Sequence, residues 1–214
     1  MDHKELITLL RTAETVEIID ERRDEIAELI PEVRNMFDFD QKTKYQNYDL
    51  WTHCLYTVKN LPKDLNDDLV FLAALIHDIG KTYTQHQSTA KGIEEGEMSY
   101  EGHEEKGLEI LNESVIPSLE KAGVSFTPEE LERLRYYVGS HHLQPSWTMK
   151  KFMRKQLMLH PLNYLIGLCQ LQLADCHAQK KYTLSQTRAQ VCEYIIEKSD
   201  SDKFSNMVSG GFIF

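Results

Sequence analysis

A run of eight apolar residues, Leu69 to Ile76, is followed at once by the polar pair His77-Asp78. The run is too short to cross a bilayer, which takes about 20 residues. The segment from Asn66 to Asp78 instead predicts a helix that is apolar on nearly every side from Leu69 onward, and therefore central and buried. Its polar end is unusual, because burying an imidazole and a carboxylate is costly unless they are paired or bound to a metal ion.

Helical periodicity dominates the rest of the chain. Apolar residues recur at spacings of three and four between Leu6 and Ile30, and Pro31 either ends this stretch or kinks it. Asp49 fits the N-cap of a helix that ends near Asn60, and Gly80 is expected to provide the C-terminal stop of the apolar helix. Further helices are expected over residues 102–119, 128–142, 160 or 161 to about 181, and 184–198.

The stretch from Lys81 to Tyr100 departs from this pattern. It is polar, contains Gly92 and Gly96, and alternates weakly at each end, which is typical of a small β-hairpin or a mobile flap. No repeat, low-complexity tract or linker divides the chain. We therefore expect a single all-α domain, a helical bundle, over residues 1–214.

Composition excludes several classes of protein. The 214 residues include 24 Lys and Arg against 34 Asp and Glu, a formal net charge of −10, which argues against a protein that coats duplex DNA. Four cysteines without a C-x-x-C pair are too few for a disulfide framework, and the N-terminus lacks the apolar segment of a signal peptide. We expect a cytoplasmic protein that does not associate with a membrane.

Histidines and aspartates near the expected helix ends are the candidates for chemistry. They are His53, His77, Asp78, His103, His141, His142 and Asp175. Imidazole and carboxylate suit first-row divalent metals, and the set contains no thiolate. Adjacent helical residues point about 100° apart, so His77 and Asp78 hold one ion together only if the helix end is directed at it. Taken singly, each residue has an ordinary structural explanation, and their order along the chain favours a metal site.

The same residues resemble a known family. The sequence LIHDIGK at 75–81 matches the central signature of the HD domain superfamily of metal-dependent phosphohydrolases, and YDLWTH at 48–53 is similar to its first-ligand helix. The sequence YEGHEE at 100–105 is similar to the HD domains attached to bacterial CCA-adding tRNA nucleotidyltransferases. The likeness runs from about Val16 to Lys181, which would be the core. The N-terminal helix, the C-terminal helix and the apolar tail Phe212 to Phe214 would be additions to it.

Departures from these relatives narrow the expected function. The chain has no strand-rich nucleotidyltransferase head and no Gly-Ser plus Asp-x-Asp motif, so nucleotide addition is not expected. Leu143-Gln144-Pro145 follows the histidine pair in place of the Gly-Tyr-Pro context of cyclic di-GMP phosphodiesterases, which argues against that substrate.

The resemblance implies a ligand set and a cofactor. Asp78 would bridge two groups of ligands: His53, His77 and Asp175 on one side, and His103 with one or both of His141 and His142 on the other. The cofactor would be one or two divalent ions of iron, manganese, nickel or cobalt, or magnesium, activating a water for attack on a phosphoester. Asp78 and Lys81 would then be the catalytic residues.

Basic residues supply candidate contacts to the substrate. Lys81 follows the ligand pair at the helix exit, where it either reaches a phosphate oxygen or complements the helix dipole. A basic cluster from Lys150 to Lys155 follows Trp147. Such a cluster is a solvated face by default, and if it lines the site it would guide nucleotide or RNA phosphates. Lys151 and Arg154 are its candidate substrate-binding residues.

Together these features predict a phosphatase or phosphodiesterase acting on a small, nucleotide-like phosphoester or an RNA end. A first alternative is a di-iron oxygenase of the HD fold, since ligand identity does not separate the two. A second is a nucleotide- or RNA-binding module without catalysis, which the intact ligand set argues against. Neither duplex DNA nor a membrane is an expected partner.

Overall fold

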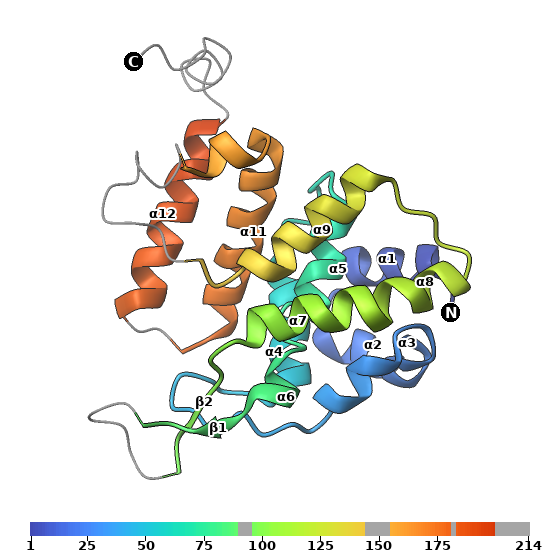
Figure 1. The fold of residues 1–214 in the computed structure, drawn as a ribbon, viewed down its shortest axis with the longest axis horizontal. Helices are drawn as coiled ribbons and strands as arrows, with labels where there is room; N and C mark the ends of the chain where they lie inside the picture. The colour runs from blue at the N-terminus through green and yellow to red at the C-terminus, as the bar shows by residue number, and fades with distance from the viewer. Residues whose placement is uncertain (90–95, 144–154, 181–182, 200–214) are drawn as a thin grey trace.

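The computed structural model describes residues 1–89, 96–143, 155–180 and 183–199. In these residues the regular secondary structure is helical apart from one small two-stranded hairpin (Figure 1), which confirms the expected all-α fold. The elements, in chain order, are α1 (His3–Thr12), α2 (Val16–Asp20), α3 (Arg23–Leu29), the 3-10 helix η1 (Pro31–Met36), α4 (Leu50–Asn60), α5 (Asp68–Ile76), α6 (Lys81–Thr84), the strands β1 (His86–Gln87) and β2 (Met98–Ser99), α7 (His103–Ile110), the π-helical segment η2 (Leu111–Val115), α8 (Ile116–Lys121), α9 (Pro128–Ser140), α11 (Leu162–Ala178) and α12 (Thr183–Ser199).

Helix α5 lies at the centre of the bundle, as its apolar run predicts. Leu69 to Ile76 are all buried, and the helix contacts α1, α4, α9 and α11 (Figure 1). Asp67 caps its first turn by accepting the N–H of Leu69 at 3.1 Å and also accepts the hydroxyl of Tyr137 on α9 at 2.8 Å. Each large apolar side chain buried here contributes about 1.5–3 kcal/mol. This packing fixes the position of the residues that follow Ile76.

Helix α4 is anchored at its start. The carboxylate of Asp49 accepts the N–H of Thr52 at 2.9 Å, which confirms the expected N-cap. One residue into the helix, the indole of Trp51 donates to Asp20 of α2 at 2.8 Å. The inward face of α4 therefore has a fixed rotation, and His53 lies on that face.

Gly80 is present for a different reason from the one expected. Helix α5 already ends at Ile76, and Gly80 precedes α6 with a right-handed backbone, φ −65° and ψ −20°, so Gly80 is not the C-terminal stop of the apolar helix. A Cβ on Gly80 would lie 2.1 Å from the carbonyl oxygen of His103 and 2.7 Å from the amide nitrogen of Gly107. The absence of a side chain therefore lets α7 approach the turn after α5 closely.

The structure also shows how the chain continues at Pro31 and over residues 81–100. Pro31 ends α3 and begins η1, because Ile30 before it leaves the helical conformation, with φ −127° and ψ 84°. The segment 81–100 begins with the short helix α6, which the sequence did not predict, and β1 and β2 then form the base of a hairpin, with His86 opposite Ser99 and Gln87 opposite Met98. Residues 90–95 between the strands, and the tail Phe212 to Phe214, lie outside the described residues. Among the residues that are described, no helix is both long and apolar enough to span a bilayer.

Candidate metal centre

Five helical segments meet at one buried point. They bring together His53 of α4, the pair His77-Asp78 after α5, His103 at the start of α7, His141 after α9 and Asp175 of α11. None of these six residues is more than 4% exposed. The chain thus concentrates imidazoles and carboxylates in its interior, which requires that they satisfy one another or a bound cation.

The two oxygens of Asp78 face different histidines. Its Oδ2 lies 3.4 Å from His53 Nε2 and 3.3 Å from His77 Nε2. Its Oδ1 lies 3.5 Å from His103 Nε2 and 3.3 Å from His141 Nε2. The end of α5 is therefore directed at the site, which meets the condition for His77 and Asp78 to act together. Asp78 has the position of a bridging carboxylate.

Asp175 completes the first of the two groups. Its Oδ1 lies 3.1 Å from His53 Nε2 and 3.8 Å from His77 Nε2. Among the described residues, three triplets have their ligand atoms within 4.8 Å of one another: His53, His77 and Asp175; Asp78, His103 and His141; and His103, Glu104 and His142. The first two are buried and share the surroundings of Asp78, whereas Glu104 and His142 of the third are partly or fully exposed.

Backbone carbonyls fix the tautomers of three of the histidines. The Nδ1 atoms lie within hydrogen-bonding distance of carbonyl oxygens three residues earlier: His77 to Ala74 at 2.9 Å, His103 to Tyr100 at 2.7 Å and His141 to Val138 at 2.7 Å. A carbonyl only accepts, so each Nδ1 must carry the proton, and in the neutral ring the lone pair is on Nε2. All three lone pairs point at Asp78, the arrangement that metal-binding histidines adopt.

The inward atoms lack hydrogen-bond partners of their own. Neither nitrogen of His53 nor the Nε2 of His77 makes a hydrogen bond, and the Nε2 atoms of His103 and His141 lie 3.2 Å apart. Lone pairs on imidazoles thus face one another and two carboxylates, and only a cation or shared protons can reconcile them. These residues fit one or two divalent metal ions.

Local charges set the ionisation of these groups. Burial by itself would raise the pKa of Asp78, but Lys81 and His77 outweigh it and hold that pKa well below its usual range. Burial likewise opposes ionisation of Asp175, yet its contact with His53 lowers the pKa of this carboxyl. Burial lowers the pKa of His103. Both acids are consequently anionic at neutral pH and His103 is neutral, the forms that bind metals. His77 differs: burial opposes its protonation, but Asp78 outweighs burial and raises the pKa of this imidazole well above its usual value, so metal binding at its Nε2 would release a proton.

Comparison with known proteins identifies the family. The family model described as HD domain matches residues 9–179. The chain belongs to the HD domain family. HD domains bind divalent metals, and their superfamily comprises metal-dependent phosphohydrolases. The buried cluster has the composition and the position along the chain that such a centre requires.

Two curated relatives of this HD domain are similar over part of their length. Both are named Multifunctional CCA protein, from Legionella pneumophila strain Lens and from Legionella pneumophila subsp. pneumophila strain Philadelphia 1. Each is 30% identical over 89 residues, which is 41% of this chain and 20% of the relative. The matched stretch therefore represents one fifth of those proteins.

Lys81 lies against the bridging carboxylate. Its ammonium donates to Asp78 Oδ2 at 2.6 Å and to the side-chain oxygen of Gln41 at 3.1 Å, and it lies 5.4 Å from the centre of the Tyr100 ring. The lysine is buried but lines a cavity that adjoins the centre. Its role toward substrate stays a prediction.

The structure does not place the other residues predicted from the sequence at the centre of the site. His142 turns away from Asp78: its side chain is 42% exposed and its Nδ1 lies 3.8 Å from Glu104. Of the adjacent pair, His141 is thus the one that faces the bridging aspartate. Lys151 and Arg154 lie outside the described residues, so their assignment as substrate contacts stays a prediction.

Sequence reasoning missed two residues that touch Asp175. Gln179 donates to its Oδ1 at 2.6 Å, and Arg188 of α12, which is 1% exposed, has its Nη1 3.5 Å from Oδ2. A signal for Arg188 exists in the sequence. It stands three, four and seven residues before Val191, Cys192 and Ile195, so it occupies a position in the apolar stripe of its helix.

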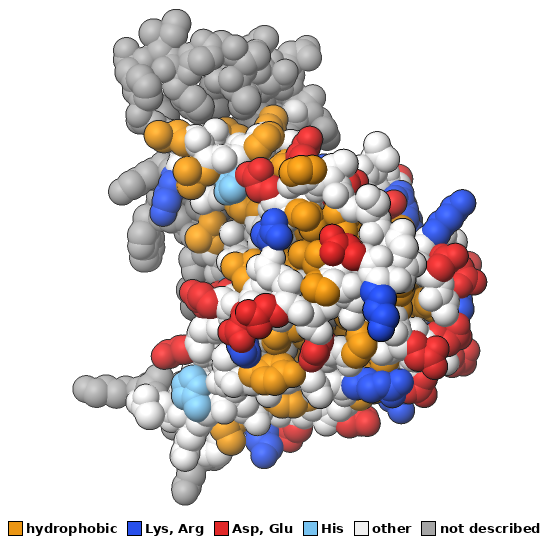
Figure 2. Space-filling view, turned by 45° about the vertical axis from the view of Figure 1, so that its right-hand side comes forward, with side chains coloured by type: hydrophobic (Ala, Val, Ile, Leu, Met, Phe, Trp, Pro, Cys, Tyr) orange, Lys and Arg blue, Asp and Glu red, His pale blue; other side chains and the backbone are white. Residues whose placement is uncertain are grey.

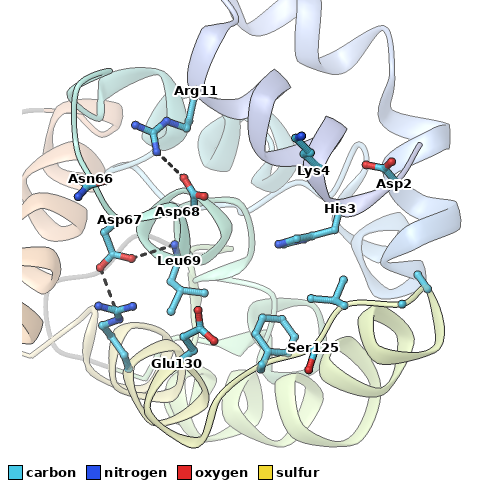
Figure 3. Close-up of a pocket in the computed structure, with 15 residues that line it drawn as sticks. Asp2, His3, Lys4, Arg11, Asn66, Asp67, Asp68, Leu69, Ser125 and Glu130 are labelled. Atoms are coloured by element: carbon cyan, nitrogen blue, oxygen red, sulfur yellow. Dashed lines mark hydrogen bonds and ion pairs between the residues drawn. The ribbon is translucent and has the colours of Figure 1, made fainter.

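Two of the cavities lined by the described residues lie near opposite ends of α5. One of about 640 Å³ lies at the far end of α5, beside Asp67 and Asp68. Figure 3 shows that both of these carboxylates are engaged, Asp68 with Arg11 and Asp67 with the backbone N–H of Leu69. This cavity is separated from the metal centre by the length of α5, about 15 Å. The other, of about 590 Å³, is lined by Lys81, His103 and His142. Only the second adjoins the metal centre.

The metal content of two histidine variants tests whether the site holds two ions. Because His103 faces Oδ1 of Asp78, His103→Ala is expected to lower the bound divalent metal by about one equivalent. His142→Ala, the matched control, removes a histidine at the same cavity that does not face Asp78 and should leave the count unchanged. Elemental mass spectrometry on protein purified without chelator gives both values. Equal metal contents in the two variants would contradict the assignment of His103 as a ligand.

Proposed function

We propose that this HD domain is a hydrolase of small, nucleotide-like phosphoesters, acting as a phosphatase or phosphodiesterase. The observation that carries the proposal is the division of Asp78 between two histidine groups, with Lys81 on the same carboxylate and open to the adjoining cavity. A substrate phosphate entering from that cavity reaches the lysine and the metal-binding residues together.

The residues of the chain divide the work of such a reaction. When bound, divalent ions activate a water molecule and offset charge on the phosphate oxygens. Asp78 and Asp175 supply the negative charge that retains the ions, and the carbonyl-bound histidines hold fixed rotamers around them. Lys81 adds a donor for a phosphate oxygen at the mouth of the centre. Because the ligands are almost fully buried, bulk water is excluded from all sides except the cavity.

The surface supports a small substrate rather than duplex nucleic acid. The face seen in Figure 2 mixes acidic and basic side chains instead of gathering the basic ones along one path, and the net charge is −10. Phosphate-backbone binding depends on concentrated positive charge. An RNA end remains within the proposal, because only its terminal phosphate has to enter the centre.

Replacing Lys81 separates substrate binding from metal binding. Lys81→Met keeps the length and burial of the side chain but removes its charge. We expect kcat/KM to fall about 10-fold or more, the loss typical of one charge-assisted contact, with the metal content unchanged. Lys81→Arg should retain part of the activity. An unaltered kcat/KM in Lys81→Met would reduce Lys81 to a partner of Asp78.

A metal and substrate survey tests the function itself. Protein purified without chelator is analysed for iron, manganese, nickel, cobalt and magnesium, and then assayed on p-nitrophenyl phosphate, bis-p-nitrophenyl phosphate and a set of nucleotides, in air and under nitrogen. Hydrolysis in both atmospheres is the expected result. Turnover that consumes dioxygen would instead support a di-iron oxygenase, and metal binding with no turnover would support a binding module.

A further inference from the structure

Arg188 of α12 is a buried cation with few partners. It is 1% exposed, and its Nε and Nη2 make no hydrogen bond. Among the described residues, Asp175 is the one carboxylate within ion-pair distance, with its Oδ2 3.5 Å from Nη1. A buried charge that is only partly satisfied costs free energy, and a buried ion pair is weak evidence for stability. The arginine is therefore explained better by its effect on Asp175 than by a contribution to stability.

The two oxygens of Asp175 have different neighbours. Its Oδ1 lies 3.1 Å from Nε2 of His53 and accepts the side-chain N–H of Gln179 at 2.6 Å. Its Oδ2 has the guanidinium of Arg188 beside it. Because a carboxylate oxygen carries two lone pairs, Oδ1 has one for Gln179 and one for an ion held with His53. The carboxylate is thus divided between the metal centre and a fixed positive charge.

An aspartate carboxylate turns readily unless something holds it. The rotation about its terminal bond has a broad, two-fold profile, and a carboxylate binds a metal ion through one oxygen or through both. The partner of Oδ2 comes from a different helix: α12 packs along α11, which carries Asp175 (Figure 1), and Cys192 and Ile195 are buried in that contact. Arg188 is therefore anchored independently of Asp175 and is able to hold its outer oxygen in place.

We infer that Arg188 is a positioning residue of the metal centre. It holds Oδ2 of Asp175 outward, so that the carboxylate offers only Oδ1 to an ion beside His53. Two effects oppose each other here, because a positive charge repels a metal ion while a fixed ligand retains it. Removing the partner of a metal ligand typically weakens metal binding about 10- to 100-fold, so we expect orientation to outweigh repulsion. The inference concerns metal retention and goes beyond the proposed hydrolysis.

Cobalt binding by Arg188 variants tests the inference without any substrate. The full chain is freed of metal with a chelator and titrated with cobalt(II) in competition with a chromophoric chelator. Arg188→Met keeps much of the apolar stem and removes the guanidinium, and it should weaken cobalt binding by about 10-fold or more. Arg188→Lys keeps the charge and should restore the affinity to within about 3-fold of the wild type. The visible bands of bound cobalt should change in Arg188→Met and not in Arg188→Lys, because a second carboxylate oxygen alters the coordination number.

Cys192→Ala is the matched control. Cys192 is buried on the same helix, and its thiol donates to Gln172 rather than to Asp175. The substitution should lower Tm and leave cobalt affinity unchanged. Equal weakening in Cys192→Ala and Arg188→Met would assign the effect to helix packing and overturn the inference.

Two further outcomes of the titration would also overturn it. Unchanged cobalt affinity in Arg188→Met would show that the arginine does not position Asp175, and tighter binding would show that its charge only repels the ion. If circular dichroism shows that Arg188→Met does not fold, Arg188→Gln takes its place with the same expected weakening. No ester is hydrolysed in these experiments. A chain that hydrolyses no phosphoester would therefore contradict the proposed function and leave the role of Arg188 standing.

Discussion

Asp78→Asn is expected to abolish both the metal complement and the activity of this HD domain. The amide keeps the size of the side chain but removes the negative charge that two histidine groups share. Since each oxygen faces a different group, the loss affects both ion positions at once. We expect bound metal to fall close to zero and kcat/KM to fall by at least about 1,000-fold, on the order of the contribution of a catalytic metal.

The other end of the same helix supplies the control. Asp67 is the N-cap of α5, and asparagine caps helices as well as aspartate does. Asp67→Asn should therefore keep the wild-type metal content and rate. Elemental analysis, circular dichroism and steady-state kinetics on both variants decide the matter. A full metal complement in Asp78→Asn would refute the bridging role.

Gly80→Ala is expected to have the largest effect on stability. The added methyl group would lie 2.1 Å from one backbone atom of α7 and 2.7 Å from another, and backbone cannot move aside as a flexible side chain can. We expect the free energy of unfolding to fall by roughly 3 kcal/mol. For a domain of this size that lowers Tm by roughly 6–12 °C.

Gly107 faces Gly80 across the same contact and provides the comparison. A Cβ there would have Val138 Cγ1 as its nearest neighbour, at an ordinary 3.5 Å. Gly107→Ala should change the free energy of unfolding by no more than about 1 kcal/mol, since alanine also favours the helix. Chemical denaturation of both variants measures the difference. A Gly80→Ala protein as stable as Gly107→Ala would show that α7 does not approach the turn this closely.

The helices and the ligand set could be predicted from the sequence because each depends on residues close together in the chain. The run Leu69 to Ile76 has no polar face, so it had to be central, and the polar residues that end it had to be satisfied there. The remaining ligands were predicted from their order on successive helices: His53, His103, His141 and Asp175. The family resemblance then supplied their grouping around Asp78. The structure brings all of them together, and metal occupancy itself stays a prediction.

Contacts between segments far apart in the chain could not be predicted from the sequence. Gly80 looked like a helix stop because glycine commonly ends helices, and nothing near it in the sequence shows that another backbone passes close by. Gln41 sits in a polar, aperiodic stretch without any signal that its side chain meets Lys81. Glu97 likewise resembles any acid of a surface hairpin. Its burial depends on Lys44, which precedes it by more than fifty residues.

Helix α12 packs against the rest of the fold although it lies beyond the residues that match the family. The HD match stops at residue 179, yet α12 supplies Arg188 beside Asp175, and its Cys192 and Ile195 pack with Leu165 and Cys169 of α11. A fragment cut at the end of the match would expose that apolar face and remove the arginine beside Oδ2 of Asp175. Expression boundaries for this protein should accordingly follow its packing and extend through α12.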